Sequence, residues 1–300
     1  MTRALAGVIA PVVTTFDAVS GALAPIPFRA NVRAHMAAGL SGVVVAGSTG
    51  EAPLLDEDER ARLVEWTRPL VPDDRWLIAG AGAESTRRAI ARTRQAAERG
   101  ADAALVLSPH YFGAAMTPEA LATHFRRVAD ESPLPIILYN IPKYTHFAID
   151  PGLVAELARH GNIIGIKDSA GELKMLGAYL ESQSERFTVL TGHGGSFYPA
   201  LEMGARGGIL AVALFAAQVA QELCSSFLAG DKPGAGRAQG RLTPLAKEIV
   251  AGFGVAGVKA AMDVVGLEGG PVRPPLLPLR AAALDRVKEL VRDARLSRAA

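Results

Sequence analysis

The sequence predicts an α/β fold: a closed (β/α)8 barrel of the TIM type followed by a C-terminal helical extension. Eight short apolar runs recur along the chain, each followed by a stretch long enough for one helix, and no further run follows the eighth. Runs this uniformly apolar are typical of parallel strands that are covered on both faces. We therefore expect a barrel catalytic domain over residues 1–228 and helices over 229–300, with an open doubly wound sheet as the alternative.

The expected strands are spaced roughly 20 to 35 residues apart, which leaves room for the crossover helix that parallel strands require. They are GVIAPVV at 7–13, GVVVAG at 42–47, WLIAG at 76–80, AALVL at 103–107, PIILY at 135–139, IIGIK at 163–167, FTVLT at 187–191 and GGILAV at 207–212.

Capping residues mark the ends of several helices between these strands. A polar side chain before the first turn accepts a backbone amide, proline fits the first helical position, and glycine ends a helix. The signals are Asp56 with Glu59, Ser85 with a stop at Gly100, Thr117-Pro118, Asp150-Pro151, and stops at Gly39 and Gly161. In the extension, helices are expected near 215–229, 243–265 and 280–296.

Composition narrows the class of protein. Apolar residues make up 49% of the chain, and 32 basic residues nearly balance 30 acidic ones without clustering, so neither nucleic acid nor a membrane is an expected partner. A single cysteine, Cys224, excludes an internal disulfide framework. Because no export signal or membrane span is evident either, we expect a cytoplasmic protein.

One lysine and one tyrosine stand at the ends of neighbouring expected strands. Lys167 ends IIGIK and Tyr139 ends PIILY, and strand alternation aligns the two, so that if Lys167 points into the barrel we expect Tyr139 to do so too. Desolvation lowers the pKa of a buried amine, so Lys167 is a candidate nucleophile that condenses with a ketone to form a Schiff base, while Tyr139 moves protons. The alternative is a structural lysine that pairs with Asp168.

Loops after two other strands supply further candidates. GSTGE at 47–51 follows the second strand, and its amides and hydroxyls suit a carboxylate, although an ordinary turn has the same composition. PHYFG at 109–113 places Tyr111 after the fourth strand, where an aromatic side chain serves as wall or as catalyst.

Together these motifs resemble the signatures of the dihydrodipicolinate synthase and N-acetylneuraminate lyase family, and GGPVRPPL at 269–276 extends the resemblance toward the C-terminus. The resemblance implies a lyase, a class I aldolase that acts on pyruvate and an aldehyde or 2-oxo acid through a Schiff base and needs no cofactor. It also implies a homotetramer, a dimer of dimers, in which a loop aromatic of one subunit can reach its neighbour's site.

The resemblance also implies a role for each site residue. Lys167 forms the imine, and Tyr139, Ser48 and Tyr111 form a proton relay. The substrate-binding residues are Thr49 and Gly50 with their amides, Gly192, Ile209, Ser169 and Tyr144.

This chain departs from the pattern of the lysine-pathway synthases at two places that concern the second substrate. Lysine-pathway synthases of this family usually carry arginine where this chain has Tyr144, and a phenol cannot replace a bidentate guanidinium. KDSAG at 167–171 resembles the motif of 4-hydroxy-2-oxoglutarate and 2-keto-3-deoxy sugar acid aldolases, so Ser169 and His146 are candidates for the distal part of the substrate. We therefore expect an aldolase of a 4-hydroxy-2-oxo acid, with dihydrodipicolinate synthase as the alternative.

Other classes of function stay open as alternatives. A metal-dependent aldolase would need clustered ligands, but the six histidines lack HxH or HExxH spacing, so no metal is expected. A non-catalytic barrel that binds a 2-oxo acid would need no proton relay. The combination of lysine, tyrosine and hydroxyl residues favours the enzyme.

Overall fold

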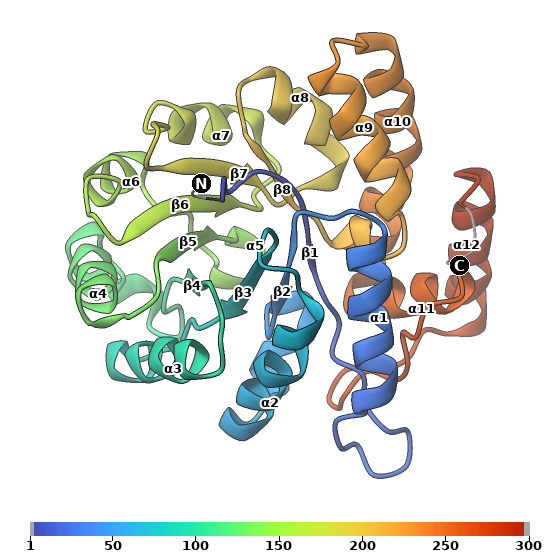
Figure 1. Ribbon diagram of the computed structural model, residues 1–300, viewed down its shortest axis with the longest axis horizontal. Helices are drawn as coiled ribbons and strands as arrows, with labels where there is room; N and C mark the ends of the chain where they lie inside the picture. Colours follow the sequence, from blue (N-terminus) through green and yellow to red (C-terminus); the bar gives the residue numbers. More distant parts are fainter. Residues whose placement is uncertain (1–2, 297–300) are drawn as a thin grey trace.

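The protein folds as a closed barrel of eight parallel strands that pair in sequence order, with β8 returning to β1. A computed structural model describes residues 3–296 (Figure 1). The barrel expected from the spacing of apolar runs is confirmed, and the open sheet is wrong. The strands are β1 (Gly7–Pro11), β2 (Gly42–Val45), β3 (Trp76–Gly80), β4 (Ala103–Leu107), β5 (Ile136–Asn140), β6 (Ile163–Asp168), β7 (Thr188–Thr191) and β8 (Gly207–Ile209).

Helices surround the strands, and the last four lie together on one side of the barrel (Figure 1). The α-helices are α1 (Pro25–Ala37), α2 (Glu57–Thr67), α3 (Thr86–Glu98), α4 (Pro118–Glu131), α5 (Pro142–Thr145), α6 (Pro151–Leu157), α7 (Leu173–Leu180), α8 (Phe197–Glu202), α9 (Ala217–Leu228), α10 (Lys232–Pro244), α11 (Gly254–Val264) and α12 (Ala281–Asp293). Shorter turns are η1 (Ser48–Gly50), η2 (Ala52–Leu54), η3 (Arg68–Leu70), η4 (Gly113–Ala115), η5 (Gly194–Ser196), η6 (Ala211–Leu214) and the π-helical η7 (Leu245–Phe253).

Strand alternation divides the apolar side chains into two cores. One cluster fills the barrel interior and includes Val44, Ile137 and Ile209, whereas a larger one packs the outer face of the strands against the helices. Side chains that point inward at the carboxyl ends of the strands therefore stand above a dry, packed floor. We call this end of the barrel the mouth.

Most of the expected helix boundaries are confirmed. Asp56 and Glu59 form a capping box, and the side chains of Ser85, Thr117 and Asp150 each accept a backbone amide at the start of a helix. Gly39 and Gly100 follow helices α1 and α3 with φ of 79° and 89°. Gly161 is not a helix stop, because α6 already ends at Leu157.

Two elements differ from the sequence prediction. The eighth strand is only three residues long, and the apolar residues after it form η6. Helix α10 contains three glycines and two prolines and lies where no helix is expected from the sequence; Asp231 caps it by accepting the amide of Gly234 at 2.9 Å. Its buried face, Ala235, Ala238 and Leu242, packs against α9, so tertiary burial outweighs the low helix propensity.

No helix in residues 3–296 combines the length and apolar composition needed to span a membrane.

Candidate active site

Lys167 and Tyr139 lie side by side at the mouth. They are register partners on β6 and β5, and the Lys167 Nζ is 4.2 Å from the centroid of the Tyr139 ring. Both side chains are buried, with 5% and 4% of their surface exposed. The juxtaposition expected from strand alternation is therefore present, and it places an amine against a phenol in an apolar setting.

Asp168 does not pair with Lys167. Its carboxylate accepts hydrogen bonds from Asn140 Nδ2 at 2.7 Å and from the amide of Ala170 at 3.1 Å, on the opposite face of the strand. Burial raises the pKa of Asp168, while the Asn140 hydrogen bond opposes this shift. Among residues 3–296, no acidic side chain forms an ion pair with Lys167, so the structural alternative for this lysine lacks its partner.

The turn after β2 holds the hydroxyl candidates. Ser48, Thr49 and Gly50 form η1, whose carbonyl at Gly50 accepts a hydrogen bond from the Thr14 Oγ1 at 2.6 Å. A Cβ at Gly50 would lie 2.9 Å from the carbonyl oxygen of Val12, so glycine permits this close approach to the residue that follows β1. The turn thus lies close to the carboxyl end of β1, and its Ser48 borders the mouth.

Gly192 leaves the space that Lys167 needs. A Cβ at this position would lie 2.8 Å from Lys167 Cε and would overlap the hydroxyl of Ser169. Lys167, Ser169 and Gly192 therefore meet at the ends of β6 and β7. Ile209, buried on β8, belongs to the interior cluster on which these residues stand.

A cavity of about 770 Å³ opens at the mouth. It brings Ser48, Tyr139 and Tyr144 together with residues from the C-terminal part of the chain, among them Phe253 and Leu276. Tyr144 is 42% exposed, and burial of its remaining surface raises the pKa of its phenol, with a smaller contribution from Tyr139. Tyr144 thus presents a neutral hydroxyl to the cavity.

Tyr111 is not brought into this cavity by its own chain. It is 77% exposed and packs edge to face on Phe112, with ring centroids 5.0 Å apart. Glu84 holds the loop by accepting the backbone amides of His110 and Tyr111 at 3.0 and 2.9 Å. His146 is exposed as well, at a left-handed turn with φ of 64°, and it does not line the cavity.

Sequence reasoning missed the charged residues that support the turn. Glu51 follows η1 and contacts Lys259 and Arg273 from the C-terminal part of the chain. Glu51 ends the GSTGE motif and Arg273 lies within GGPVRPPL, so each residue lies in a motif that can be recognised in the sequence. Nothing in the sequence indicates that they meet.

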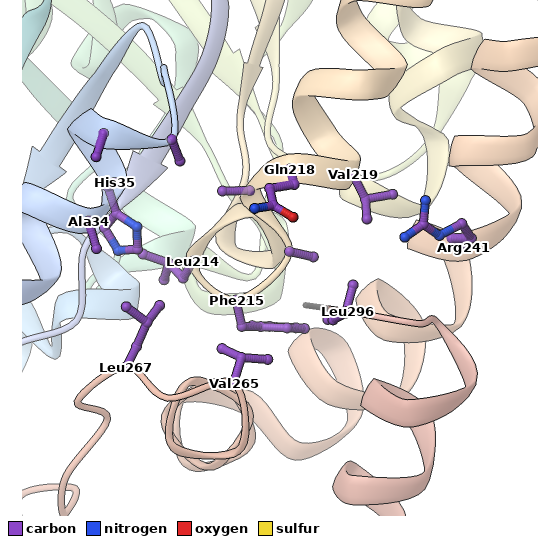
Figure 2. A pocket seen from close by; sticks show the side chains of 14 residues that line it. Ala34, His35, Leu214, Phe215, Gln218, Val219, Arg241, Val265, Leu267 and Leu296 are labelled. Carbon is purple, nitrogen blue, oxygen red and sulfur yellow. The ribbon is translucent and has the colours of Figure 1, made fainter. Parts of the chain in front are cut away.

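A second cavity, of about 200 Å³, lies between α1, η6 and the C-terminal helices (Figure 2). His35 and Phe215 are among its lining residues, whereas none of the sequence-predicted site residues is. Burial lowers the pKa of His35 to about 4, so its imidazole is neutral near pH 7. In residues 3–296, no set of three His, Cys, Asp or Glu side chains gathers as a metal site would.

Comparisons with a family profile and with individual proteins point to the same family. Residues 4–294 match the profile of the Dihydrodipicolinate synthetase family. The chain is 37% identical over 291 residues to a 4-hydroxy-tetrahydrodipicolinate synthase from Xanthomonas axonopodis pv. citri (97% of this chain, 95% of that protein). It is 36% identical over 276 residues to one from Methanothrix thermoacetophila, covering 91% of each chain.

Solved structures of this family share the fold closely. A chloride-inhibited dihydrodipicolinate synthase from Acinetobacter baumannii, complexed with pyruvate, superimposes with a TM-score of 0.92 at 29% identity, covering 98% of this chain and all of that one. A prophage protein of the same family from E. coli, also in complex with pyruvate, gives 0.91 at 30% identity, covering 97% and 99%.

Proposed function

Because the chain belongs to the dihydrodipicolinate synthetase family, whose members are lyases of the class I aldolase type that use pyruvate, we propose that Lys167 is its imine-forming residue. The observation that carries this proposal is the buried Lys167 Nζ, 4.2 Å from the Tyr139 ring and without an acidic partner in the part of the chain that the structure describes. An amine in that setting needs little desolvation before it attacks a carbonyl.

The proposed reaction begins with pyruvate. The Lys167 amine adds to C2 of the ketone, the carbinolamine loses water, and the resulting imine draws electrons from C3 as a proton leaves it. The enamine then attacks the carbonyl carbon of an aldehyde, and water releases the product and regenerates the amine. Each proton transfer needs a nearby hydroxyl, which Tyr139 and Ser48 at the mouth are positioned to supply.

Thr49, Gly50 and their amides are the proposed receptor of the pyruvate carboxylate, with Gly192 and Ile209 lining the space beside the imine. The place of the turn η1 supports this role: its Ser48 lines the mouth cavity, and its Gly50 accepts a hydrogen bond from Thr14, shortly after the end of β1. An anion held by several oriented donors would fix C2 of pyruvate against Lys167.

For the second substrate, the relatives favour aspartate semialdehyde, the acceptor of the synthase reaction. The matching relatives carry the name 4-hydroxy-tetrahydrodipicolinate synthase, which supports this alternative better than the 4-hydroxy-2-oxoglutarate reading favoured by the sequence motif. One observation still favours the aldolase: Tyr144 offers a neutral phenol where a second carboxylate would need a cation.

Ser169, next to Gly192, is the residue we propose to contact the distal part of either substrate.

Two measurements test these proposals. Borohydride reduction in the presence of pyruvate should attach the three-carbon unit irreversibly to Lys167, which peptide mass spectrometry locates; an adduct on another lysine would overturn the assignment. Condensation with aspartate semialdehyde and pyruvate release from a panel of 4-hydroxy-2-oxo acids and keto-deoxy sugar acids should then be compared by kcat/KM. The larger value decides between synthase and aldolase, and no turnover in either arm would favour a binding barrel.

The homotetramer and the cytoplasmic location remain predictions. The exposed pair Tyr111 and Phe112 supports association, because two adjacent aromatic side chains on one loop are unusual on a free surface. In such an assembly Tyr111 would join the relay of a neighbouring subunit rather than its own.

A further inference from the structure

A buried ion pair joins the C-terminal part of the chain to the turn at the mouth. The Lys259 Nζ on α11 lies 2.5 Å from the Glu51 Oε1, and it also donates a hydrogen bond to the carbonyl of Pro271 at 2.6 Å. The two side chains are 2% and 0% exposed. Buried charges are costly unless they are paired, so this contact is a specific feature of the fold.

The groups around Lys259 make it difficult for water to take the place of Glu51 as its partner. Its Nζ lies 4.7 Å from the centroid of the Phe16 ring, in a cation–π arrangement. Burial lowers the pKa of Lys259, and the attraction of Glu51 opposes that shift. The ammonium and the carboxylate therefore depend on each other for their charged forms.

Arg273 makes a second connection to the same region. Its backbone amide donates to the Glu51 Oε2 at 2.8 Å, while its guanidinium binds both carboxylate oxygens of Glu59, at 2.6 and 2.7 Å. The guanidinium also donates to the carbonyl of Leu54 at 2.7 Å. The segment around Arg273 is thus bound to both η2 and α2, the two elements that follow the Ser48–Gly50 turn in the chain.

Glu51 connects the C-terminal part of the chain to the Ser48–Gly50 turn. Its backbone adopts the left-handed conformation, with φ of 58°, and its amide donates to the carbonyl of Ser48 at 3.1 Å. A non-glycine residue keeps such a conformation only where its surroundings hold it. The side chain of Glu51 is held from the C-terminal part of the chain, while its backbone closes the turn that carries Ser48 and Thr49.

We propose that Glu51 and Lys259 are positioning residues that hold the Ser48–Gly50 turn in register with Lys167 and Tyr139. The proposal rests on the proposed function, in which this turn supplies the relay hydroxyl and the carboxylate receptor. Neither residue touches the reacting atoms. Their effect on the reaction runs through the placement of the turn, where a displacement of about 1 Å is enough to slow turnover on the order of 10²-fold.

Three variants separate positioning from simple stability. Glu51→Gln and Lys259→Met each leave one buried charge without its partner, whereas the double variant Glu51→Gln/Lys259→Met removes both charges and keeps the volume filled. Asp102→Asn is the matched control. The Asp102 Oδ2 bridges Arg3 at 3.2 Å and Arg68 at 3.1 Å at the opposite end of the barrel, so its loss also breaks a network of ion pairs.

The readouts are the melting temperature and kcat/KM for pyruvate, measured about 10 °C or more below each transition. Both single variants should melt earlier and lose roughly 10- to 100-fold in kcat/KM. The double variant should recover most of the melting temperature while its kcat/KM stays low, and Asp102→Asn should lose stability but keep kcat/KM within about 2-fold.

Recovery of both quantities in the double variant would overturn the proposal, because the pair would then be purely structural. A loss of kcat/KM in Asp102→Asn as large as in the single variants would do the same. If the single variants fail to fold, the double variant alone carries the test. Failure of the proposed function is seen separately: it shows as a borohydride adduct away from Lys167 in the unmodified protein, whatever the variants do.

Discussion

Two buried lysines of this protein, one on β6 and one on α11, have similar surroundings but different partners. Lys167 and Lys259 are 5% and 1% exposed, and each places its Nζ over an aromatic ring, Tyr139 in one case and Phe16 in the other. Lys259 has a carboxylate 2.5 Å away, whereas none pairs with Lys167 in residues 3–296. In the part of the chain that the structure describes, burial thus accompanies two different settings: Lys259 is held in an ion pair, whereas the amine of Lys167 has no acidic partner.

The largest expected effect comes from removing the unpaired lysine. Lys167→Met should lower kcat by about 10³-fold or more, because it removes the amine that is proposed to form the imine. Pyruvate with borohydride should label the unmodified protein at Lys167 and leave Lys259 unlabelled, as read by peptide mass spectrometry. Labelling of Lys259 would show that the ion pair does not keep that amine from reacting.

For stability, the order of the two lysines should be reversed: replacing Lys259 should cost more than replacing Lys167. Lys259→Met leaves Glu51 buried without its partner and should lower the free energy of unfolding by about 3 to 5 kcal/mol. Lys167→Met removes an amine that has no acidic partner and should change this free energy by about 1 kcal/mol or less. Urea denaturation at one fixed protein concentration compares them, and equal losses at both positions would remove the distinction between the two lysines.

The ring beside each lysine offers a further contrast. Tyr139→Phe keeps the ring under Lys167 but deletes the phenol, so kcat should fall on the order of 10²-fold with a smaller change in pyruvate affinity. Steady-state kinetics and circular dichroism together check that activity is lost without loss of the fold. Near-normal turnover would make Tyr139 a packing residue, as Phe16 is beside Lys259.

A third buried base extends the comparison to pH. His35 has a pKa of about 4 because it is buried, below its ordinary value of 6.5, so the folded state favours the neutral ring. The stability that this confers is complete above pH 6.5 and is lost as the pH falls toward 4, by up to about 3 kcal/mol. His35→Leu should flatten that part of the stability profile; His124, whose pKa burial also lowers to about 4, retains its own share. A profile unchanged by His35→Leu would contradict this assignment.

The smallest expected effect concerns the second substrate. Tyr144→Arg adds a cation to the mouth cavity and should raise kcat/KM for condensation with aspartate semialdehyde by roughly 10- to 100-fold. Kinetics with a neutral aldehyde serve as the control and should change little. If the unmodified protein already prefers aspartate semialdehyde and the variant gains nothing, another group receives the second carboxylate.

Much of the barrel could be predicted from sequence because each βα unit is specified locally. Apolar runs set the strands, capping residues such as Asp56 set the helix starts, and alternation alone places Lys167 beside Tyr139. Helix α10 could not be predicted, since its glycines oppose helix formation and only packing against α9 stabilises it.

Long-range contacts account for the rest. Glu51 and Arg273 are 222 residues apart in the chain, and no local pattern indicates that an amide of one binds the carboxylate of the other. The exposed position of Tyr111 is likewise set by how Glu84 holds its loop. Sequence motifs thus identify which side chains carry chemistry, while tertiary contacts determine where each one is held.

The attachment of Glu51 to Lys259 and Arg273 also concerns how the protein is made. All eight strands, with Lys167 and Tyr139, leave the ribosome before the residues that fasten the turn at the mouth. During synthesis the Ser48–Gly50 turn therefore lacks this support until α11 and the segment around Arg273 have been made. A chain cut short after β8 would lack both attachments of the turn, together with η6 and α9, which pack against β1.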